Sequence, residues 1–172
     1  WNTGEKTPKI KVHPLQTSAY EVIATTDGCN AIDKVTVHVH SLPIAEAGED
    51  VSICAGDSVK LTATGGASCE WTPGIPNGVL FTPAETRVYY VLVTNDYGCT
   101  DRDSVFVMVN PTPETPVITL KGDSLISNAL TGNQWYLDDN PVHDGSFQTL
   151  IPPETGTYYT IVTLDGCVSQ PS

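Results

Sequence analysis

The sequence predicts an all-β fold in which β-sandwich domains follow one another in tandem, with essentially no helix. A motif recurs about every 69 residues, which indicates an array of small structural units. Apolar and polar residues alternate with a period of two, as in strands with one buried face. Clusters of Gly, Pro, Asp and Asn separate these segments at spacings of roughly 8–12 residues, which is typical of a β-sandwich.

The repeated motif consists of a Trp, then a Tyr, then a turn of the Asp-Gly type followed by a Cys. The three copies are Trp1, Tyr20 and Cys29; Trp71, Tyr89 and Cys99; and Trp135, Tyr158 and Cys167. The first copy is partial because the numbering starts at its Trp, the second is complete, and the third is nearly complete. We therefore expect these 172 residues to belong to a longer polypeptide. Tandem copies of one small module usually supply length, spacing or multivalent contact.

Strands are expected wherever alternation or β-branched residues stand between turn clusters. Residues 35–39 and 105–109 carry Val at every second position, in corresponding places of two copies. The later segment is apolar on both faces because Phe106 and Met108 lie between its valines, so we expect it to be covered on both sides. The other expected strands are residues 9–13, 19–26, 51–54, 57–64, 79–82, 86–95, 116–120, 123–127, 133–137 and 156–164.

Two Pro-rich stretches, residues 41–50 and 110–116, interrupt the strand pattern once per period. Proline fixes φ and removes a backbone donor, so these stretches are expected to form short, stiff linkers. The predicted domains are residues 1–42, the C-terminal part of a first repeat; 43–112, a complete repeat; and 113–172, a third, nearly complete repeat.

The aromatic residues of the motif are predicted to form the cores. In a small two-sheet core, Trp71 and Trp135 would fill the centre, with Tyr89 and Tyr158 facing them from a later strand. A Trp that stacks on a sugar is the alternative interpretation. The neighbouring tyrosines fall on the opposite face by alternation and are better candidates for exposed stacking, although plain surface residues are the simpler interpretation: Tyr90, Tyr136 and Tyr159.

The chain has five cysteines and no C-x-x-C pair, so neither a zinc site nor a redox motif is indicated. Within the complete copy we predict a Cys54–Cys99 disulfide, worth roughly 4 kcal/mol on the chain-entropy model. Cys29 corresponds to Cys99, and its partner would precede residue 1. Cys167 has no counterpart of Cys54 in its own copy, so it is expected to be unpaired or to bridge elsewhere, and Cys69 is an extra thiol. Disulfides imply an oxidising compartment.

The net charge of −12, from 20 acidic and 8 basic residues, argues against nucleic acid as a partner because phosphate backbones require Lys and Arg clusters. No stretch approaches the length of an apolar membrane span. The sequence also lacks the nucleophile elbow, metalloprotease, P-loop and dinucleotide motifs, so an enzyme is not expected.

Calcium is the one metal for which the sequence offers ligands. Glu49 and Asp50 lie in the first linker, and Asp101 and Asp103 follow a turn. Hard oxygen ligands near a domain junction would bind Ca²⁺ and stiffen the array. Ordinary solvated acids are the alternative interpretation.

The residues Val51-Ser-Ile-Cys54-Ala-Gly-Asp57, then Trp71-Thr-Pro, then Tyr89 and Asp96-Tyr-Gly-Cys99, resemble the PKD-like and Ig-like repeats of Bacteroidota surface proteins. Such repeats are abundant in gliding-motility adhesins and other large type IX secretion substrates. The resemblance covers essentially the whole chain. It implies Ig-like sandwiches, an extracellular or outer-surface location, and no catalytic residues in the repeat.

The same resemblance implies a modification. Bacteroidota attach O-linked glycans to Asp-Ser/Thr-aliphatic tripeptides, and this chain has three of them, centred on Ser58, Ser104 and Ser124. The alternative is that Asp-Ser simply opens a β-strand in each case.

Together these observations predict a non-catalytic structural or adhesive segment, a stalk or adhesin whose partners are further repeats of the same chain and a surface polysaccharide or cell-surface protein. The alternative is an accessory module, possibly carbohydrate-binding, of a secreted polysaccharide-degrading enzyme. The sequence does not separate a spacer from an adhesin, because binding loops carry no general signature.

Overall fold

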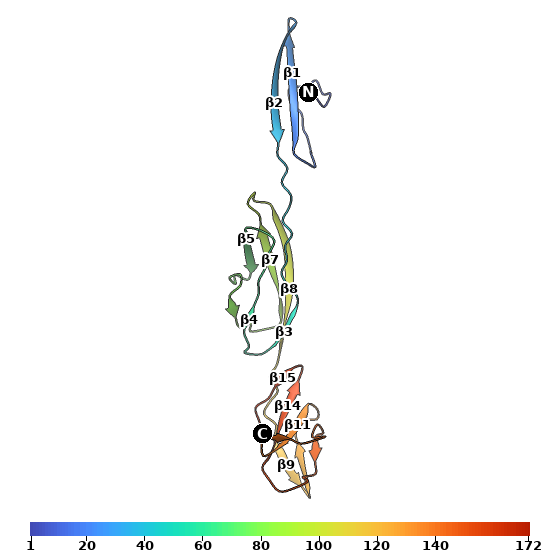
Figure 1. Ribbon diagram of the computed structural model, residues 1–172, viewed down its shortest axis with the longest axis vertical. Coiled ribbons are helices and arrows are strands. Elements are labelled where there is room, and N and C mark those ends of the chain that lie inside the picture. Colours follow the sequence, from blue (N-terminus) through green and yellow to red (C-terminus); the bar gives the residue numbers. More distant parts are fainter.

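A computed structural model describes all 172 residues, and it contains strands, turns and extended segments but no helix. The strands form three groups placed end to end along the longest axis of the molecule (Figure 1). We name these groups unit 1 (β1 and β2), unit 2 (β3 to β8) and unit 3 (β9 to β15). The predicted all-β class is confirmed, and no helix is present that could span a membrane.

Unit 2 is a two-layer sandwich. Its strands are β3 (Val51–Cys54), β4 (Val59–Lys60), β5 (Ser68–Thr72), β6 (Leu80–Phe81), β7 (Arg87–Thr94) and β8 (Thr100–Asn110). One sheet has the order β3-β8-β7-β5, and the other is the pair β4-β6. The first strand, β3, joins the sheet of the last strand, β8, and the second and fourth strands, β4 and β6, form the opposite layer. This is an Ig-like arrangement.

The first and last strands of unit 2 run parallel. Val51 lies opposite Val107 and Cys54 lies opposite Asn110, so both strands end at the same edge of the unit, nearest to unit 3. The core between the layers is built from the alternating residues of β7 and β8 that face inward, together with Trp71, Leu61 and Ala63. Val105 and Val107 are 1% and 0% exposed, as expected for a strand with neighbours on both edges and a layer above it.

Unit 3 has the same two-layer plan with different edges. Its strands are β9 (Ile118–Lys121), β10 (Ser124–Ser127), β11 (Asn133–Leu137), β12 (Asn140–Pro141), β13 (Thr149–Leu150), β14 (Tyr158–Leu164) and β15 (Cys167–Val168). The sheets have the orders β13-β10-β9 and β12-β11-β14-β15. Trp135 is fully buried at the centre, opposite Thr160 on the neighbouring strand.

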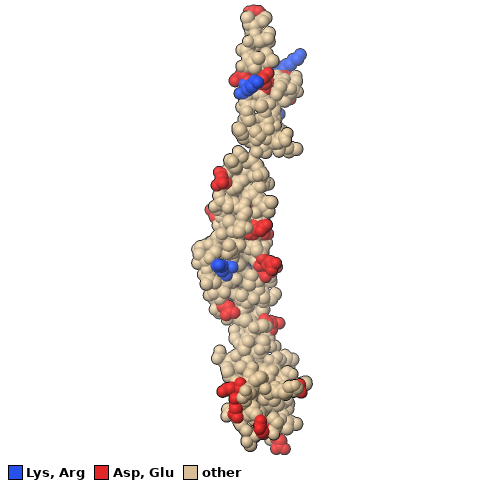
Figure 2. All heavy atoms as spheres, in the orientation of Figure 1, with Lys and Arg blue, Asp and Glu red and all other residues tan.

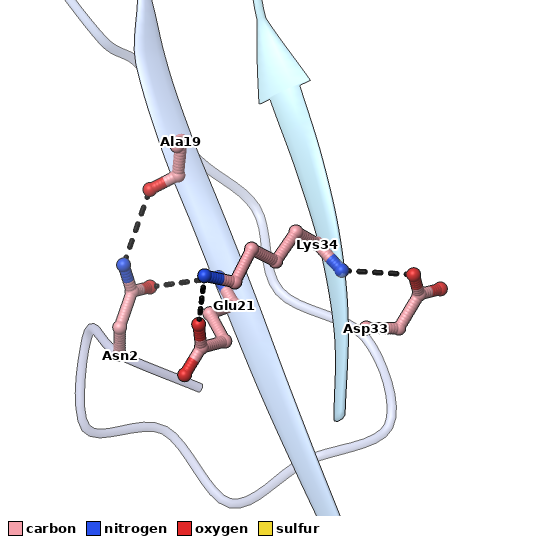
Figure 3. Close-up of polar contacts among 5 residues, drawn as sticks. All are labelled: Asn2, Ala19, Glu21, Asp33 and Lys34. Atoms are coloured by element: carbon pink, nitrogen blue, oxygen red, sulfur yellow. Dashed lines mark hydrogen bonds and ion pairs between the residues drawn. The ribbon is translucent and has the colours of Figure 1, made fainter. Parts of the chain in front are cut away.

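Unit 1 is a single hairpin of β1 (Ser18–Thr26) and β2 (Cys29–Val37), with the first residues of the chain packed along it. Asn2 takes the place of a neighbouring strand, because its side-chain amide donates to the carbonyl of Ala19 and its Oδ1 accepts from the amide of Glu21 (Figure 3). Lys34 lies opposite Glu21 and its Nζ is 2.8 Å from the carboxylate. This pair is exposed, so its contribution to stability is small.

The predicted core aromatics are confirmed for Trp71, Tyr89 and Trp135, which are all buried. The prediction of a core position is wrong for Tyr158, because its side chain is only half-buried. Strand β14 begins at Tyr158 itself, so the ring lies at the rim of the sheet, and its hydroxyl donates to the carbonyl of Glu154. Tyr89 lies two residues inside β7 and is covered by the ring of Phe81.

Candidate functional site

The residues with distinctive chemistry gather at the two junctions between units. At the junction of units 2 and 3, Cys54 at the end of β3 forms a disulfide with Cys167 at the start of β15. The Cα atoms are 5.5 Å apart, within the normal range, and the sequence separation is 113 residues. A covalent bond therefore joins two units that are successive in the chain.

The predicted Cys54–Cys99 disulfide is wrong. Cys99 immediately precedes β8, whereas Cys54 lies opposite Asn110, the last residue of that strand. Eleven strand residues at about 3.3 Å each separate the two positions by roughly 35 Å. Cysteines more than about 7 Å apart cannot be bridged, and Cys99 is a free, half-buried thiol.

Asn110 organises the polar contacts of the same junction. Its side-chain amide donates to the carbonyl of Asp165 in unit 3, at 3.2 Å, and to the hydroxyl of Ser52 in unit 2, at 2.9 Å. Its own carbonyl accepts the amide of Ala55. The turn of unit 3 that carries Cys167 is thus held against the end of β8 by hydrogen bonds as well as by the disulfide.

The turns that carry the cysteines are tight hairpins. Asp165 and Gly166 both have positive φ, of 49° and 81°, as required at the two centres of a type I′ turn. Unit 2 has one extra residue at this place, Tyr97, so its turn is longer and only Gly98 has positive φ. The Asp-Gly-Cys motif is therefore the tip of the hairpin that faces the preceding unit.

The junction of units 1 and 2 has the same geometry without a disulfide. The side-chain amide of Asn95 donates to the carbonyl of Ser41 at 2.9 Å. The ring of His40 stacks on that of Tyr97, with centroids 3.7 Å apart and planes 12° from parallel. Here too, the tip of the hairpin of one unit contacts the segment that follows the last strand of the unit before it.

The linker between these units is fixed along unit 2 by carboxylates. Asp101 Oδ2 accepts the amide of Ala45 at 3.0 Å, and Asp103 Oδ2 accepts the amide of Ala47 at 2.7 Å. A hydrogen bond in the opposite sense comes from the linker itself, where Asp50 Oδ1 accepts the amide of Phe106 in β8 at 2.7 Å. Charged acceptors make such hydrogen bonds stronger than neutral ones. The amide of Ala45, followed by that of Arg102, lowers the pKa of Asp101 below the ordinary aspartate value.

The predicted calcium site is not formed. The structure does not assemble its proposed ligands into one set: Glu49, Asp50, Asp101 and Asp103. No group of three or more His, Cys, Asp or Glu side chains is placed to hold a metal ion. Three of these four carboxylates accept backbone amides instead. The sequence placed the acids correctly at the junction, but their role is to replace strand pairing along the linker.

Protonation of Asp101 is expected to release its contact with the linker. A folded-state pKa below the unfolded value means that the stabilisation is present at neutral pH and is lost as pH falls through the folded pKa, below about pH 4. The Ala45 amide proton should shift in an NMR pH titration with an inflection in this range. Asp101→Asn keeps an acceptor but cannot titrate, so its Ala45 resonance should show no such inflection. An unchanged inflection in the variant would assign the titration to another group.

Gly65 packs directly against the backbone of the linker at Ile44 and Ala45. A Cβ added there would lie 1.7 Å from the carbonyl oxygen of Ile44, and the φ of +110° also disfavours a side chain. Gly65→Ala is expected to displace the linker and break the reciprocal hydrogen bonds between Glu46 and Thr64, measured as lost amide exchange protection. Gly48→Ala is the matched control, because its φ is +90° but its surroundings are open. Both substitutions introduce a backbone strain of about 1–2 kcal/mol. Only Gly65→Ala also introduces a steric clash with the linker. Equal amide exchange protection in the two variants would contradict the prediction.

The tyrosines on the outer faces differ in accessibility. Tyr136 and Tyr159 stack on each other across β11 and β14, with centroids 4.9 Å apart and planes 4° from parallel. Burial, followed by the charge and hydrogen bond of Asp139, raises the pKa of Tyr159. Tyr90 is 56% exposed. The first two therefore occupy each other's faces, and Tyr90 has the more accessible ring.

The three serines of the Asp-Ser-aliphatic tripeptides all lie in or beside strands. Ser58 and Ser104 are exposed, and Ser124 is half-buried. The Ser58 hydroxyl is 2.9 Å from that of Thr82. Glycosylation of these hydroxyls stays a prediction, and Ser104 has the fewest constraints, because it is exposed on a strand facing solvent.

Hollows on the surface are shallow and differ in character between units. The most apolar, of about 410 Å³, lies on unit 1 and is lined mainly by Trp1, Pro8, Ile10, Tyr20, Val35 and Val37. Another, of about 340 Å³, lies on unit 3 beside Asp138, His143 and Glu154. Neither hollow contains a nucleophile hydrogen-bonded to a base.

No family model matches the chain, and no curated protein sequence matches it. Solved structures that resemble it are tandem Ig domains. Domains A168–A170 of titin have 16% identity and a TM-score of 0.49, covering 90% of this chain and 72% of that one. The N-terminal eight Ig domains of Down syndrome cell adhesion molecule have 20% identity and a TM-score of 0.49, over 94% of this chain and 31% of that one. Sidekick-1 Ig domains 1–5 have 18% identity and a TM-score of 0.40, over 91% and 45%. At these identities the likeness concerns the fold alone.

Proposed function

We propose that this chain is a non-catalytic, load-bearing segment of an exported surface protein, which holds other parts of that protein at a distance from the cell. The observation that carries the proposal is the disulfide between Cys54 and Cys167, because it joins two successive units rather than the two sheets of one unit. A bond in that place does little for the core of either unit. It fixes how the units are connected, which matters for a molecule under tension.

The other junction supports the same role by non-covalent means. The ring pair of His40 and Tyr97 and the carboxylates of Asp101 and Asp103 restrict the linker between units 1 and 2. The acidic side chains are spread over all three units on the face shown, and the basic ones lie mainly on unit 1 (Figure 2). The net charge of −12 supports solubility outside the cell rather than binding to nucleic acid or anionic lipid.

The finer proposal follows the resemblance of the repeat motif. We infer that the parent protein is an adhesin or a stalk of the Bacteroidota type IX secretion class, located outside the cell, with further repeats and a surface polysaccharide or cell-surface protein as partners. The disulfide supports an oxidising, extracellular location. O-linked glycans at Ser58, Ser104 and Ser124 belong to this proposal.

The exposed ring of Tyr90 supports a second candidate function, that of an accessory carbohydrate-binding module of a secreted enzyme. Its exposed ring lies beside Glu70 and Arg102 in a hollow of about 340 Å³, and aromatic faces with polar neighbours can stack on sugars. Binding of the chain to insoluble polysaccharide, abolished in Tyr90→Ala and retained in Tyr97→Ala, would support this candidate over the stalk.

The experiment that tests the main proposal is identification of the parent polypeptide in cells of the source organism, by peptide mapping of surface-labelled proteins separated by size. A very large, surface-labelled polypeptide is expected. Peptides found only in an unlabelled intracellular protein would overturn the proposal. Peptides found in a secreted protein of ordinary enzyme size would favour the accessory module.

A further inference from the structure

Strand β8 has apolar side chains on both faces, but the chain covers only one of them. Val105 and Val107 face the core and are buried against the second layer of unit 2. On the opposite face of the same sheet, Met108 is 42% exposed and Phe106 is half-buried. The sequence predicts a cover on this face as well, because a strand that is apolar on both sides is normally covered on both.

The strand register arranges this face in rows that run across β5, β7 and β8. One row consists of Glu70, Leu92 and Arg102, in that order. Glu70 and Arg102 are exposed, and they are the only charged side chains among the outward positions of these strands. We name this surface the outer face of unit 2. Its apolar side chains form a stripe along β7 and β8: Val88, Tyr90, Leu92, Phe106 and Met108.

Neither charge of the row is paired within its own chain. Glu70 and Arg102 lie two strands apart, which corresponds to about 10 Å between their backbones. The three ion pairs of the chain all involve other residues. The row therefore presents a negative, an apolar and a positive position, and such a pattern becomes complementary to itself when it is reversed.

Only one of the two possible two-fold axes between two such faces pairs these charges. An axis along β7 reverses the row, so that Glu70 of each copy lies over Arg102 of the other and Leu92 lies over Leu92. An axis along the row keeps its order, so that Glu70 never meets Arg102 and equal charges repel when the rows coincide. The axis along β7 leaves the strands of both copies running in the same direction.

The contour of the face fits the same axis. Tyr90 lies on β7, so the axis brings the exposed rings of the two copies together. A hollow of about 340 Å³ lies beside Tyr90, mainly toward β5, where Glu70, Trp71 and Thr72 line it. This hollow gives each of the two rings space on the β5 side of its neighbour.

We propose that the outer face of unit 2 binds the same face of a second copy of this chain, with the two chains side by side and pointing in the same direction. The strands of unit 2 run along the long axis of the molecule, so the contact is lateral (Figure 1). Four strands about 4.8 Å apart, along the eight residues of β7, offer roughly 500 Å² per copy. Such an area is at the low end for specific interfaces, so the contact is weak. The inference rests on the register, charges and exposure of this face and not on the proposed function.

Sedimentation equilibrium of the 172-residue protein, with its disulfide intact, tests the contact. The unmodified protein is expected to dimerise at concentrations of roughly 0.1–1 mM. Glu70→Arg and Arg102→Glu should each weaken dimerisation about tenfold or more, because each places equal charges opposite one another. An equimolar mixture of the two variants should recover the association, because each copy then supplies the charges that the other lacks.

The control for charge alone is Lys60→Glu, which makes the same change of charge as Arg102→Glu on an exposed position of β4, in the other layer. It should dimerise as the unmodified protein does. A general effect of net charge would instead strengthen dimerisation in Glu70→Arg, since this change makes the acidic chain less negative.

Cysteines at the two ends of β7 test the direction of the chains. Thr94 and Val88 occupy outward positions about 20 Å apart along the strand. In the proposed pair each position faces its own counterpart, so Thr94→Cys alone and Val88→Cys alone should each form disulfide-linked dimers, with the bonded residue identified by non-reducing peptide mapping. In an antiparallel pair, dimers would form only when the two variants are mixed.

Four outcomes would overturn the proposal. These are an unmodified protein that stays monomeric at about 1 mM, a mixture of the charge variants that associates no more strongly than either variant alone, equal loss of dimers in Lys60→Glu, and cysteine dimers that form only in the mixture. A monomeric chain that binds insoluble polysaccharide through Tyr90 would assign the outer face of unit 2 to a glycan instead.

Discussion

Pulled from its two ends, the oxidised chain is expected to extend far less than its length allows. Force applied at residues 1 and 172 passes along residues 1–54, through the disulfide, and along residues 167–172. The intervening segment carries no load, although it contains most of units 2 and 3. Single-molecule force spectroscopy should therefore show that reduction adds roughly 370–410 Å of contour length, the extended length of the 113-residue separation.

The variants for this experiment come from the cysteines themselves. Cys54→Ser combined with Cys167→Ser should give the long extension in the absence of reductant. Cys69→Ser removes a free thiol and should leave the short extension of the oxidised protein unchanged. Equal contour lengths with and without reductant would show that the two units are not joined by this bond.

Trp135→Ala is expected to cost unit 3 about 3–5 kcal/mol of unfolding free energy, the usual range for loss of a fully buried Trp. The side chain is 0% exposed, and its Nε1 donates to the carbonyl of Phe147 at 2.9 Å. The variant would therefore leave the Phe147 carbonyl without its hydrogen-bond donor, in addition to losing the packing of the indole ring. A small domain has only a few kcal/mol of stability in reserve, so unit 3 of the variant should be largely unfolded.

Urea unfolding followed by far-UV circular dichroism would measure this effect as the loss of one transition. Trp1→Ala is the matched control, because Trp1 is only half-buried and lies in unit 1. It should leave the transition of unit 3 in place. If Trp135→Ala kept that transition at its original urea concentration, Trp135 would not be the centre of the core.

The sequence carried enough information for the class of fold and most of the strands, because alternation and turn residues are local properties. Residues 51–54 and 133–137 are strands with the predicted bounds. Residues 9–13 are not a strand, since that segment lies against the hairpin without pairing to it. The two-residue strands β12, β13 and β15 were not predicted because they lie outside the alternating segments, whereas the equally short β4 and β6 lie within the predicted strands 57–64 and 79–82.

The site was harder to predict because it depends on contacts between units. The Cys54–Cys99 prediction assumed that both ends of a disulfide lie in one repeat. Because β3 pairs with β8 in parallel, Cys54 lies at the end of β8 that is remote from Cys99. Alternation in the sequence cannot distinguish a parallel from an antiparallel neighbour. One signal was present, since Cys167 had no partner available in its own copy. The carboxylates of Asp101 and Asp103 were likewise placed at the right junction, but hydrogen bonds to a linker have no sequence signature.

The position of the disulfide also bears on damage by proteases. A single cut anywhere between residues 55 and 166 divides the polypeptide but not the molecule, because the two fragments stay joined through Cys54 and Cys167. The exposed loops of units 2 and 3, where nicking is most frequent, all lie within this interval. A chain built in this way keeps both of its ends after a cut that would separate them in an ordinary chain of domains.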